Sequence, residues 1–202
     1  MQLVQLEAFK KEIAEFPIES REDILSLITR FLKGEQLNRN DFKTFKIDKS
    51  TRIQEFRVKD HRGNWRAIST IVQGQYLVFV YAFHKKSQEL LEKDKDVIRA
   101  RIKENFDMKT EKLKAQSLEE VAKDWGIDYQ VFKIKSELIN TIRKYCDDHE
   151  VSQRKLASLV PGLSQDRISK IFSGQVGHMT IDKLVEILSV LKFKVAFKAK
   201  AA

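Results

Sequence analysis

The sequence predicts an α+β N-terminal domain followed by an all-α helix-turn-helix domain. Three observations predict this order. Apolar residues recur at helical spacing near the N-terminus, alternating apolar and polar residues follow in short segments separated by tight turns, and the last third reads as short capped helices. At 202 residues the chain is long enough for two domains of about 100 residues each.

The N-terminal domain is expected to begin with two helices. Phe9 and Ile13 recur at helical spacing in the first helix, which Pro17 interrupts. Ser20 is expected to cap the second helix, because acidic residues follow it in the first turn, and Gly34 is expected to end it. Helices that are joined so closely should lie antiparallel.

An antiparallel sheet of about three to four strands is expected next. Residues 52–60, 65–72 and 76–84 alternate in strand fashion, and HRGN and QGQ separate them as short turns. Apolar residues around position 45 precede this meander. A charged helix over residues 87–106 is expected to close the domain.

The predicted domain boundaries are 1–106, then a joining segment 107–135 with one helix, then 136–202. The joining helix has a capping box from Ser117 to Glu120 and a stop at Gly126. At the C-terminus, KFKVAFKAK alternates phenylalanine, valine and alanine with lysine, so a short C-terminal strand is expected there. A lone strand needs a partner, either its twin in a dimer or the N-terminal sheet.

The composition indicates a basic protein. The net charge is +9, with 24 Lys and Arg against 18 Asp and Glu in residues 1–115, and 14 against 11 in residues 116–202. Both parts are therefore able to meet a polyanion, although a basic protein with no nucleic-acid role has the same composition. The single cysteine, Cys146, excludes an internal disulfide and a cysteine-based zinc site. The sequence contains no stretch of about 18 apolar residues, so no membrane span is predicted. A cytoplasmic protein without metal or cofactor is expected.

Residues 151–174 have the pattern of a helix-turn-helix DNA reader. Ser152 and Ser164 are suited to cap two short helices, and a Pro-Gly turn joins them. Polar residues at the start of the second helix would reach base edges or phosphate, and the start of the first helix would meet the backbone. The alternative is an ordinary helical bundle with a polar helix facing water. The predicted DNA-contacting residues are Gln153, Ser164, Gln165, Asp166, Arg167, Ser169 and Lys170.

The same stretch resembles the Xre/Cro class of phage-repressor-like domains over residues 136–192. The positions of its small, turn and apolar residues match that class from Gln153 to Gly174. The resemblance implies binding to operator DNA. A homodimer is expected, because its two-fold symmetry would match a palindromic operator.

A second group of basic residues lies in the predicted sheet. Arg57 and Arg66 are on adjacent strands, while His84, Lys85 and Lys86 end the third strand. Cleavage of RNA through its 2′-hydroxyl needs a proton acceptor, a proton donor and cations for the developing phosphorane charge. Lysine with a lowered pKa or histidine would serve as acid or base, and arginine would hold the charge. The alternative is a solvated, lysine-rich rim of the sheet.

The basic part also resembles the HigB branch of the RelE superfamily of toxins. EFR at Glu55–Arg57, WR at Trp65–Arg66 and FHKKSQ at Phe83–Gln88 follow one another as in that branch, and the match covers residues 3–105. The resemblance implies a ribosome-dependent mRNA endonuclease, in which Arg57, Arg66, His84, Lys85 and Lys86 are the catalytic candidates.

Together the two resemblances imply a toxin–antitoxin fusion. A HigB-like toxin domain would be held inhibited by a tethered HigA-like antitoxin that represses its own operon. The alternative is a dimeric transcriptional regulator whose basic domain is catalytically inactive. The expected partners are operator DNA, mRNA on the ribosome, and a toxin–antitoxin contact within or between chains.

Overall fold

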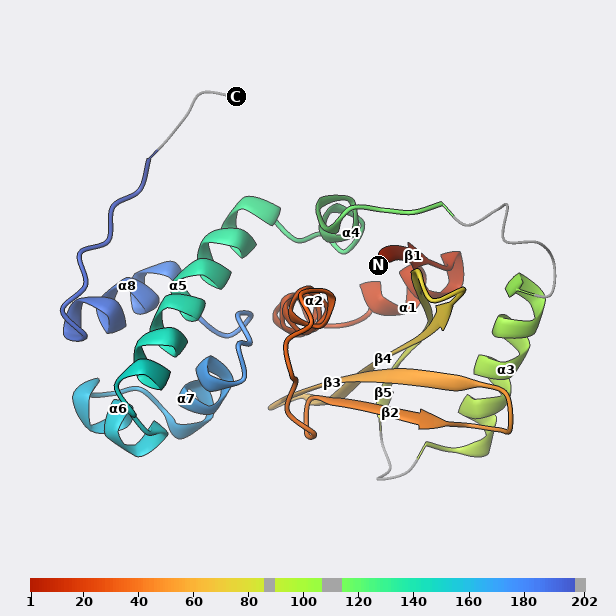
Figure 1. The fold of residues 1–202 in the computed structure, drawn as a ribbon, viewed down its shortest axis with the longest axis horizontal. Coiled ribbons are helices and arrows are strands. Elements are labelled where there is room, and N and C mark those ends of the chain that lie inside the picture. Colours follow the sequence, from red (N-terminus) through yellow and green to blue (C-terminus); the bar gives the residue numbers. More distant parts are fainter. Residues whose placement is uncertain (86–89, 107–113, 199–202) are drawn as a thin grey trace. The chain divides into compact units, whose positions relative to one another are not determined.

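A computed structural model describes residues 1–85, 90–106 and 114–198 (Figure 1). The chain divides into two compact units, Met1–Tyr129 and Gln130–Ala202. The first is an α+β unit, as the sequence predicts, and the second is all-helical in its described residues.

A five-stranded mixed sheet forms the centre of the first unit. Its strand order is β1-β5-β4-β3-β2, and the strands from β2 to β5 pair antiparallel, as predicted. The prediction missed β1, which pairs parallel with β5. A four-residue strand is too short to show alternation, and its partner lies far along the chain. The strands are β1 (Gln2–Gln5), β2 (Phe42–Lys46), β3 (Arg52–Asp60), β4 (Gly63–Val72) and β5 (Tyr76–Lys85).

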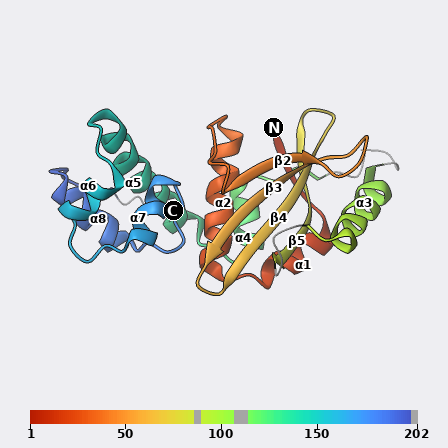
Figure 2. The same cartoon turned by 90° about the horizontal axis from the view of Figure 1, so that it is seen from below.

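Helices cover both faces of this sheet (Figure 2). Helices α1 (Glu7–Ala14) and α2 (Ile18–Leu32) pack on one face, and α3 (Glu92–Phe106) packs on the other. The core under α3 contains Ile98 of the helix itself, packed against apolar residues of the sheet. Those sheet residues are Val4, Ile53, Ile68, Val78 and Val80.

Helix α2 begins earlier than predicted. Pro17, not Ser20, is its N-cap residue, with φ −54° and ψ 144°. Because proline fixes φ near this value and needs no N–H partner, the helix starts at once at Ile18. Ser20 therefore lies in the first turn, where its hydroxyl donates to Asp60 Oδ2 over 3.0 Å. Gly34 follows the helix with φ +77°, which agrees with the predicted stop.

Helix α4 (Leu118–Asp124) has the predicted capping box. The backbone N–H of Glu120 donates to Ser117 Oγ over 3.1 Å, and the Glu120 carboxylate accepts from the Ser117 N–H over 2.7 Å. Gly126 has φ +67° and ends the helix as expected. This helix belongs to the first unit.

The second unit is built from α5 (Tyr129–Asp148), α6 (Gln153–Leu159), α7 (Gln165–Phe172) and α8 (Ile181–Val190). Helix α5 runs through the position where the sequence suggested a boundary at 135/136. It buries Cys146, and this burial raises the pKa of the thiol. No helix in the described part of the chain is long and apolar enough to cross a membrane.

The predicted C-terminal strand is absent from the described residues. Helix α8 ends at Val190, Lys192 follows with φ +68°, and the Phe193 N–H donates to Leu188 O over 2.9 Å. Residues 193–198 then continue without strand pairing, and the Phe193 ring lies edge-on to Tyr145 at 5.5 Å. The alternation of apolar residues was a misleading signal, because the described residues of this unit include no strand to pair with.

Candidate nucleic-acid interfaces

The register of the sheet places the predicted arginines directly opposite each other. Arg57 on β3 pairs with Arg66 on β4, which in turn pairs with Phe83 on β5. Lys85 lies two residues beyond Phe83 and therefore projects to the same face. This is the face on which α3 packs, because Ile53 and Ile68 alternate in phase with the arginines and reach the core under that helix. We call the surface formed by Glu55, Arg57, Arg66 and Lys85 the basic face.

A buried carboxylate, Glu55, holds the two arginines together. Its side chain is 2% exposed. Its Oε2 accepts from Arg57 Nε over 2.9 Å, and its Oε1 lies 3.1 Å from Arg66 Nε. The sequence singles out Glu55 only as part of the EFR motif. The missed signal was its spacing of two from Arg57, which puts both side chains on one face of a strand.

Burial and neighbouring cations together change the acidity of Lys85. Burial is the largest cause that lowers its pKa, and Arg66, Arg57 and Lys43 lower it further, whereas Glu55 acts in the opposite sense. Burial also lowers the pKa of Arg66, whose side chain is 13% exposed. Lys85 therefore releases its proton more readily than an ordinary lysine.

The structure does not bring His84 to the basic face. Adjacent residues of a strand point to opposite sides, and His84 lies on the other side from Lys85, stacked on Trp65 with ring centroids 4.5 Å apart. It also closes over Gly63, where a Cβ would lie 1.9 Å from His84 Nε2. Lys86, the remaining catalytic candidate, lies outside the described residues.

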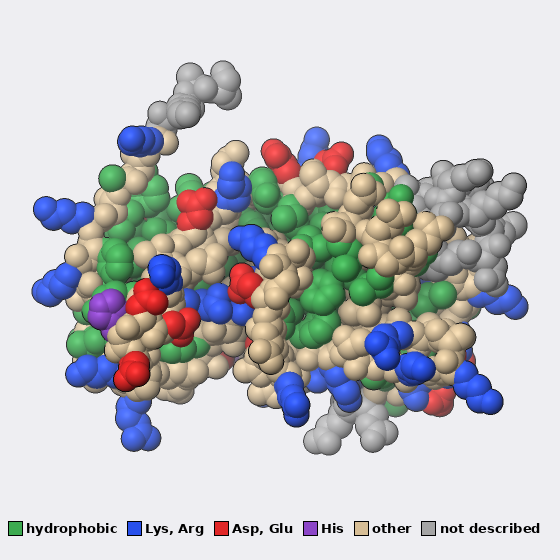
Figure 3. Space-filling view, in the orientation of Figure 1, with side chains coloured by type: hydrophobic (Ala, Val, Ile, Leu, Met, Phe, Trp, Pro, Cys, Tyr) green, Lys and Arg blue, Asp and Glu red, His purple; other side chains and the backbone are tan. Residues whose placement is uncertain are grey.

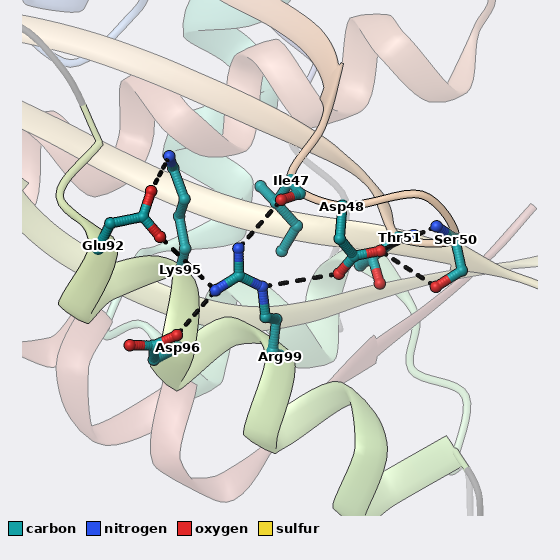
Figure 4. Close-up of polar contacts among 8 residues, drawn as sticks. All are labelled: Ile47, Asp48, Ser50, Thr51, Glu92, Lys95, Asp96 and Arg99. Carbon is teal, nitrogen blue, oxygen red and sulfur yellow. Dashed lines mark hydrogen bonds and ion pairs between the residues drawn. The ribbon is translucent and has the colours of Figure 1, made fainter.

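Helix α3, which shares this face of the sheet, is fastened to the β2–β3 turn by Arg99 (Figure 4). The Arg99 guanidinium donates to Ile47 O over 3.1 Å and to Asp96 over 2.7 Å, and lies 3.6 Å from Asp48 Oδ2. Asp48 in turn accepts from the N–H groups of Ser50 and Thr51, which lowers its pKa to about 2. The helix and the turn thus form one polar network beside the basic face.

The second unit has the geometry of a helix-turn-helix. Ser152 and Ser164 cap α6 and α7, and each accepts from the N–H three residues on. Gln165 Nε2 donates to Gln153 Oε1 over 3.0 Å, so the starts of both helices are joined by their side chains. Three further predicted residues of α7 are exposed along the same helix. They are Asp166, Arg167 and Ser169.

Lys170 differs from the expectation that it faces outward. It is 5% exposed, so its side chain is buried and does not lie on the outer surface of α7. A lysine side chain combines a long apolar stem with a charged end, and the stem is readily covered by protein. Helical spacing alone does not predict that a lysine stem is buried by the surrounding protein.

Charge alone does not locate either site. Figure 3 shows Lys and Arg side chains spread over the drawn surface with Asp and Glu among them. Within residues 1–85, 90–106 and 114–198, no group of three or more His, Cys, Asp or Glu side chains is arranged to hold a metal ion. The sites are defined instead by the strand register and the helix caps.

These features define a chain that joins an α+β domain with a cationic sheet face to a helix-turn-helix DNA-binding domain. Comparison with protein families agrees. Residues 11–103 match the family described as phage derived protein Gp49-like (DUF891), and residues 121–200 match a family described as helix-turn-helix domain. The chain thus carries a Gp49-like, HigB-type toxin domain of the RelE superfamily followed by a HigA-like helix-turn-helix domain, which confirms both resemblances. No curated protein matches the chain.

Proposed function

We propose that this toxin–antitoxin fusion cleaves mRNA on the ribosome with its basic face. In this proposal, the tethered helix-turn-helix domain inhibits that activity and represses the operon. The observation that carries the proposal is the convergence of Arg57, Arg66 and Lys85 around the buried Glu55. Three cations on one face are costly unless an anion compensates them, and Glu55 supplies only one negative charge.

The chemistry assigned to this face is attack by the RNA 2′-hydroxyl on the adjacent phosphorus. Lys85 accepts the proton of the 2′-hydroxyl, and the 2′-oxygen bonds to phosphorus to form a cyclic phosphate. The bond between phosphorus and the 5′-oxygen breaks as that oxygen takes up a proton from solvent water. Arg57 and Arg66 stabilise the negative charge on the phosphorane oxygens. Glu55 acts as a positioning residue, because its two oxygens hold the guanidinium groups side by side.

The second part of the proposal concerns operator DNA. Gln165 and Arg167 at the start of α7 read base edges in the major groove, and Gln153 contacts the backbone while it orients Gln165. A homodimer would present two such helices to a palindromic site. The tether keeps the DNA-binding domain at an effective concentration of roughly millimolar near the toxin domain, which favours inhibition without diffusion.

Cleavage of ribosome-bound mRNA by residues 1–129, which span the whole first unit, tests the enzyme. We expect cleavage by the unsubstituted fragment and a loss of about 100-fold or more for Arg66→Ala and for Lys85→Ala. The control is Lys93→Ala on the exposed side of α3, because it also removes one positive charge. Equal cleavage by all four proteins would contradict the assignment of the basic face.

Operator binding tests the DNA-reading part. At one fixed salt concentration, Arg167→Ala in the full chain should weaken binding to the DNA upstream of the coding sequence by about 10-fold to 100-fold. Gln165→Ala should act in the same direction, whereas Lys144→Ala on the exposed side of α5 should leave affinity unchanged. Unaltered affinity in both α7 variants would remove this helix from the DNA interface.

A transcriptional regulator with an inactive basic domain is the second candidate. The ion pairs of Glu55 with Arg57 and Arg66 favour this candidate, because the carboxylate partly compensates the charge of both guanidinium groups when no RNA is bound. This alternative predicts operator binding with no cleavage by residues 1–129.

A further inference from the structure

We propose that residues 116–127 are a docking segment by which the helix-turn-helix side of the chain binds the toxin domain. Trp125 is the anchor, and the surface that receives it is a protein-binding site of the toxin domain opposite the basic face. This inference holds whether or not the basic face cleaves RNA.

The start of the helix-turn-helix family match and the end of the first structural unit do not coincide in this segment. The helix-turn-helix match begins at residue 121, yet Val121, Ala122, Trp125 and Ile127 are buried in the unit Met1–Tyr129. A segment that belongs by sequence to one partner is therefore part of the core of the other. This arrangement is typical of a partner helix bound in a groove.

The indole of Trp125 is completely enclosed. Its side chain has no exposed surface, and its ring centroid lies 6.0 Å from that of Phe9 and 6.5 Å from that of Phe79. The indole N–H donates to Gln5 Oε1 over 2.6 Å. A buried tryptophan with a satisfied N–H is the kind of residue that dominates protein–protein binding.

Polar contacts surround this anchor. Gln5 Nε2 donates to Gln116 Oε1 over 3.0 Å, and Gln116 Nε2 donates to Asp124 Oδ2 over 2.9 Å. Lys10 Nζ lies 3.2 Å from the same carboxylate oxygen. The Trp125 carbonyl accepts from the Arg21 guanidinium. An apolar centre with a polar rim is the anatomy of an interface.

The segment also closes an edge of the sheet. The backbone N–H of Gln116 donates to Leu3 O over 2.8 Å, so the outer edge of β1 gains a bridge. Edge strands with unpaired backbone groups attract other chains. Docking of residues 116–127 therefore satisfies a surface that the toxin domain would otherwise expose.

Docking occurs on the face away from the catalytic candidates. Gln5 and Phe79 are paired across β1 and β5, and they alternate with Val4 and Val78, which reach the core under α3. The basic face is on the α3 side, so residues 116–127 anchor the antitoxin part without covering Arg57, Arg66 or Lys85.

The test is to cut the full chain and ask whether the parts stay together. A protease site is placed between residues 106 and 114, and the folded chain is purified, cut and diluted on a sizing column. The cut parent chain should stay associated, and Trp125→Ala should weaken the association by about 100-fold or more. Glu119→Ala, on the exposed side of α4, is the matched control and should behave as the parent.

A second variant and a second measurement separate lost binding from lost folding. Gln5→Ala removes the acceptor of the indole N–H together with the bonds that Gln5 Nε2 donates to Gln116 and Asp124, and it should weaken association by about tenfold or more. A labelled peptide of residues 114–129 should bind the uncut Trp125→Ala chain, whose own segment lacks the indole, and should not bind the parent chain. Prompt separation of the cut parent, or a cut Trp125→Ala chain that holds as tightly as the parent, would overturn the proposal.

Discussion

Glu55 sets the electrostatics of the basic face. Without it, Arg57 and Arg66 would repel each other across paired strands, since like charges directly opposite in a sheet are destabilising. The carboxylate allows two guanidinium groups to share one face while a net positive charge remains for a phosphate.

Replacement of Glu55 by glutamine should therefore destabilise the toxin domain. The substitution keeps the shape and removes the charge, which leaves two partly buried cations without their counter-ion. We expect the free energy of unfolding to fall by about 3 kcal/mol. Urea unfolding followed by tryptophan fluorescence measures it, because Trp65 and Trp125 are the two tryptophans and both lie in the unit Met1–Tyr129. Glu15→Gln at the exposed C-cap of α1 is the control, and equal effects of the two changes would contradict this role.

Lys85→Arg separates positive charge from proton transfer. Arginine keeps the cation but does not release its proton, so cleavage should fall by about 100-fold or more while RNA binding is retained. Because the base must be unprotonated, the parent rate should rise with pH until it passes the lowered pKa of Lys85. Measured pH–rate profiles should lose this rise in Lys85→Arg and keep it in Lys43→Arg. Retention of the rise in Lys85→Arg would assign the base elsewhere.

The sequence predicts the placement of some of these side chains and not of others. The cross-strand pairing of Arg57 with Arg66 follows from strand alternation and short turns. The same alternation shows that His84 and Lys85, as neighbours in one strand, point to opposite faces. The burial of Lys170 depends on tertiary packing, which helical spacing does not reveal.

At the element scale, Asp60 ties the β3–β4 turn to α2. Its carboxylate accepts from the Ser20 hydroxyl, the Arg62 and Gly63 N–H groups and the Trp65 indole. Burial alone would raise its pKa, but these hydrogen bonds lower it from 3.8 to about 2. The folded state therefore favours the charged form.

This shift makes the stability of the toxin domain depend on pH. The contribution of Asp60 is fully present above pH 3.8, the ordinary pKa of the group, and is lost as the pH falls through about 2. Asp60→Asn should lower the free energy of unfolding at pH 7 by about 2 kcal/mol, with a smaller difference from the parent near pH 2. Tryptophan-monitored urea unfolding at both pH values checks this against Glu119→Gln. A difference that stays constant with pH would contradict the assignment.

The elements that the sequence predicts are those with local signals. Helix caps at Ser117, Ser152 and Ser164 are confirmed, because capping depends on residues within one turn. Strand β1 and the missing C-terminal strand depend on distant pairing partners, so alternation misses the first and wrongly suggests the second.

At the scale of the whole molecule, α4 decides which residues belong to the toxin domain. Periodicity places it in a joining segment, while Trp125 makes it part of the toxin domain. A fragment that ends at residue 106 would expose Phe9 and Phe79, whereas residues 1–129 keep the enclosed indole. The longer fragment is therefore the right one in which to look for toxicity.

Growth after induction of residues 1–129, beside the full chain, tests whether this chain holds an active toxin in check. We expect arrest by the fragment, no arrest by the full chain, and no arrest by the fragment with Arg66→Ala. Tryptophan fluorescence is the measurement that checks whether the fragment is folded. Normal growth with a folded fragment would contradict the claim that this chain holds an active toxin in check.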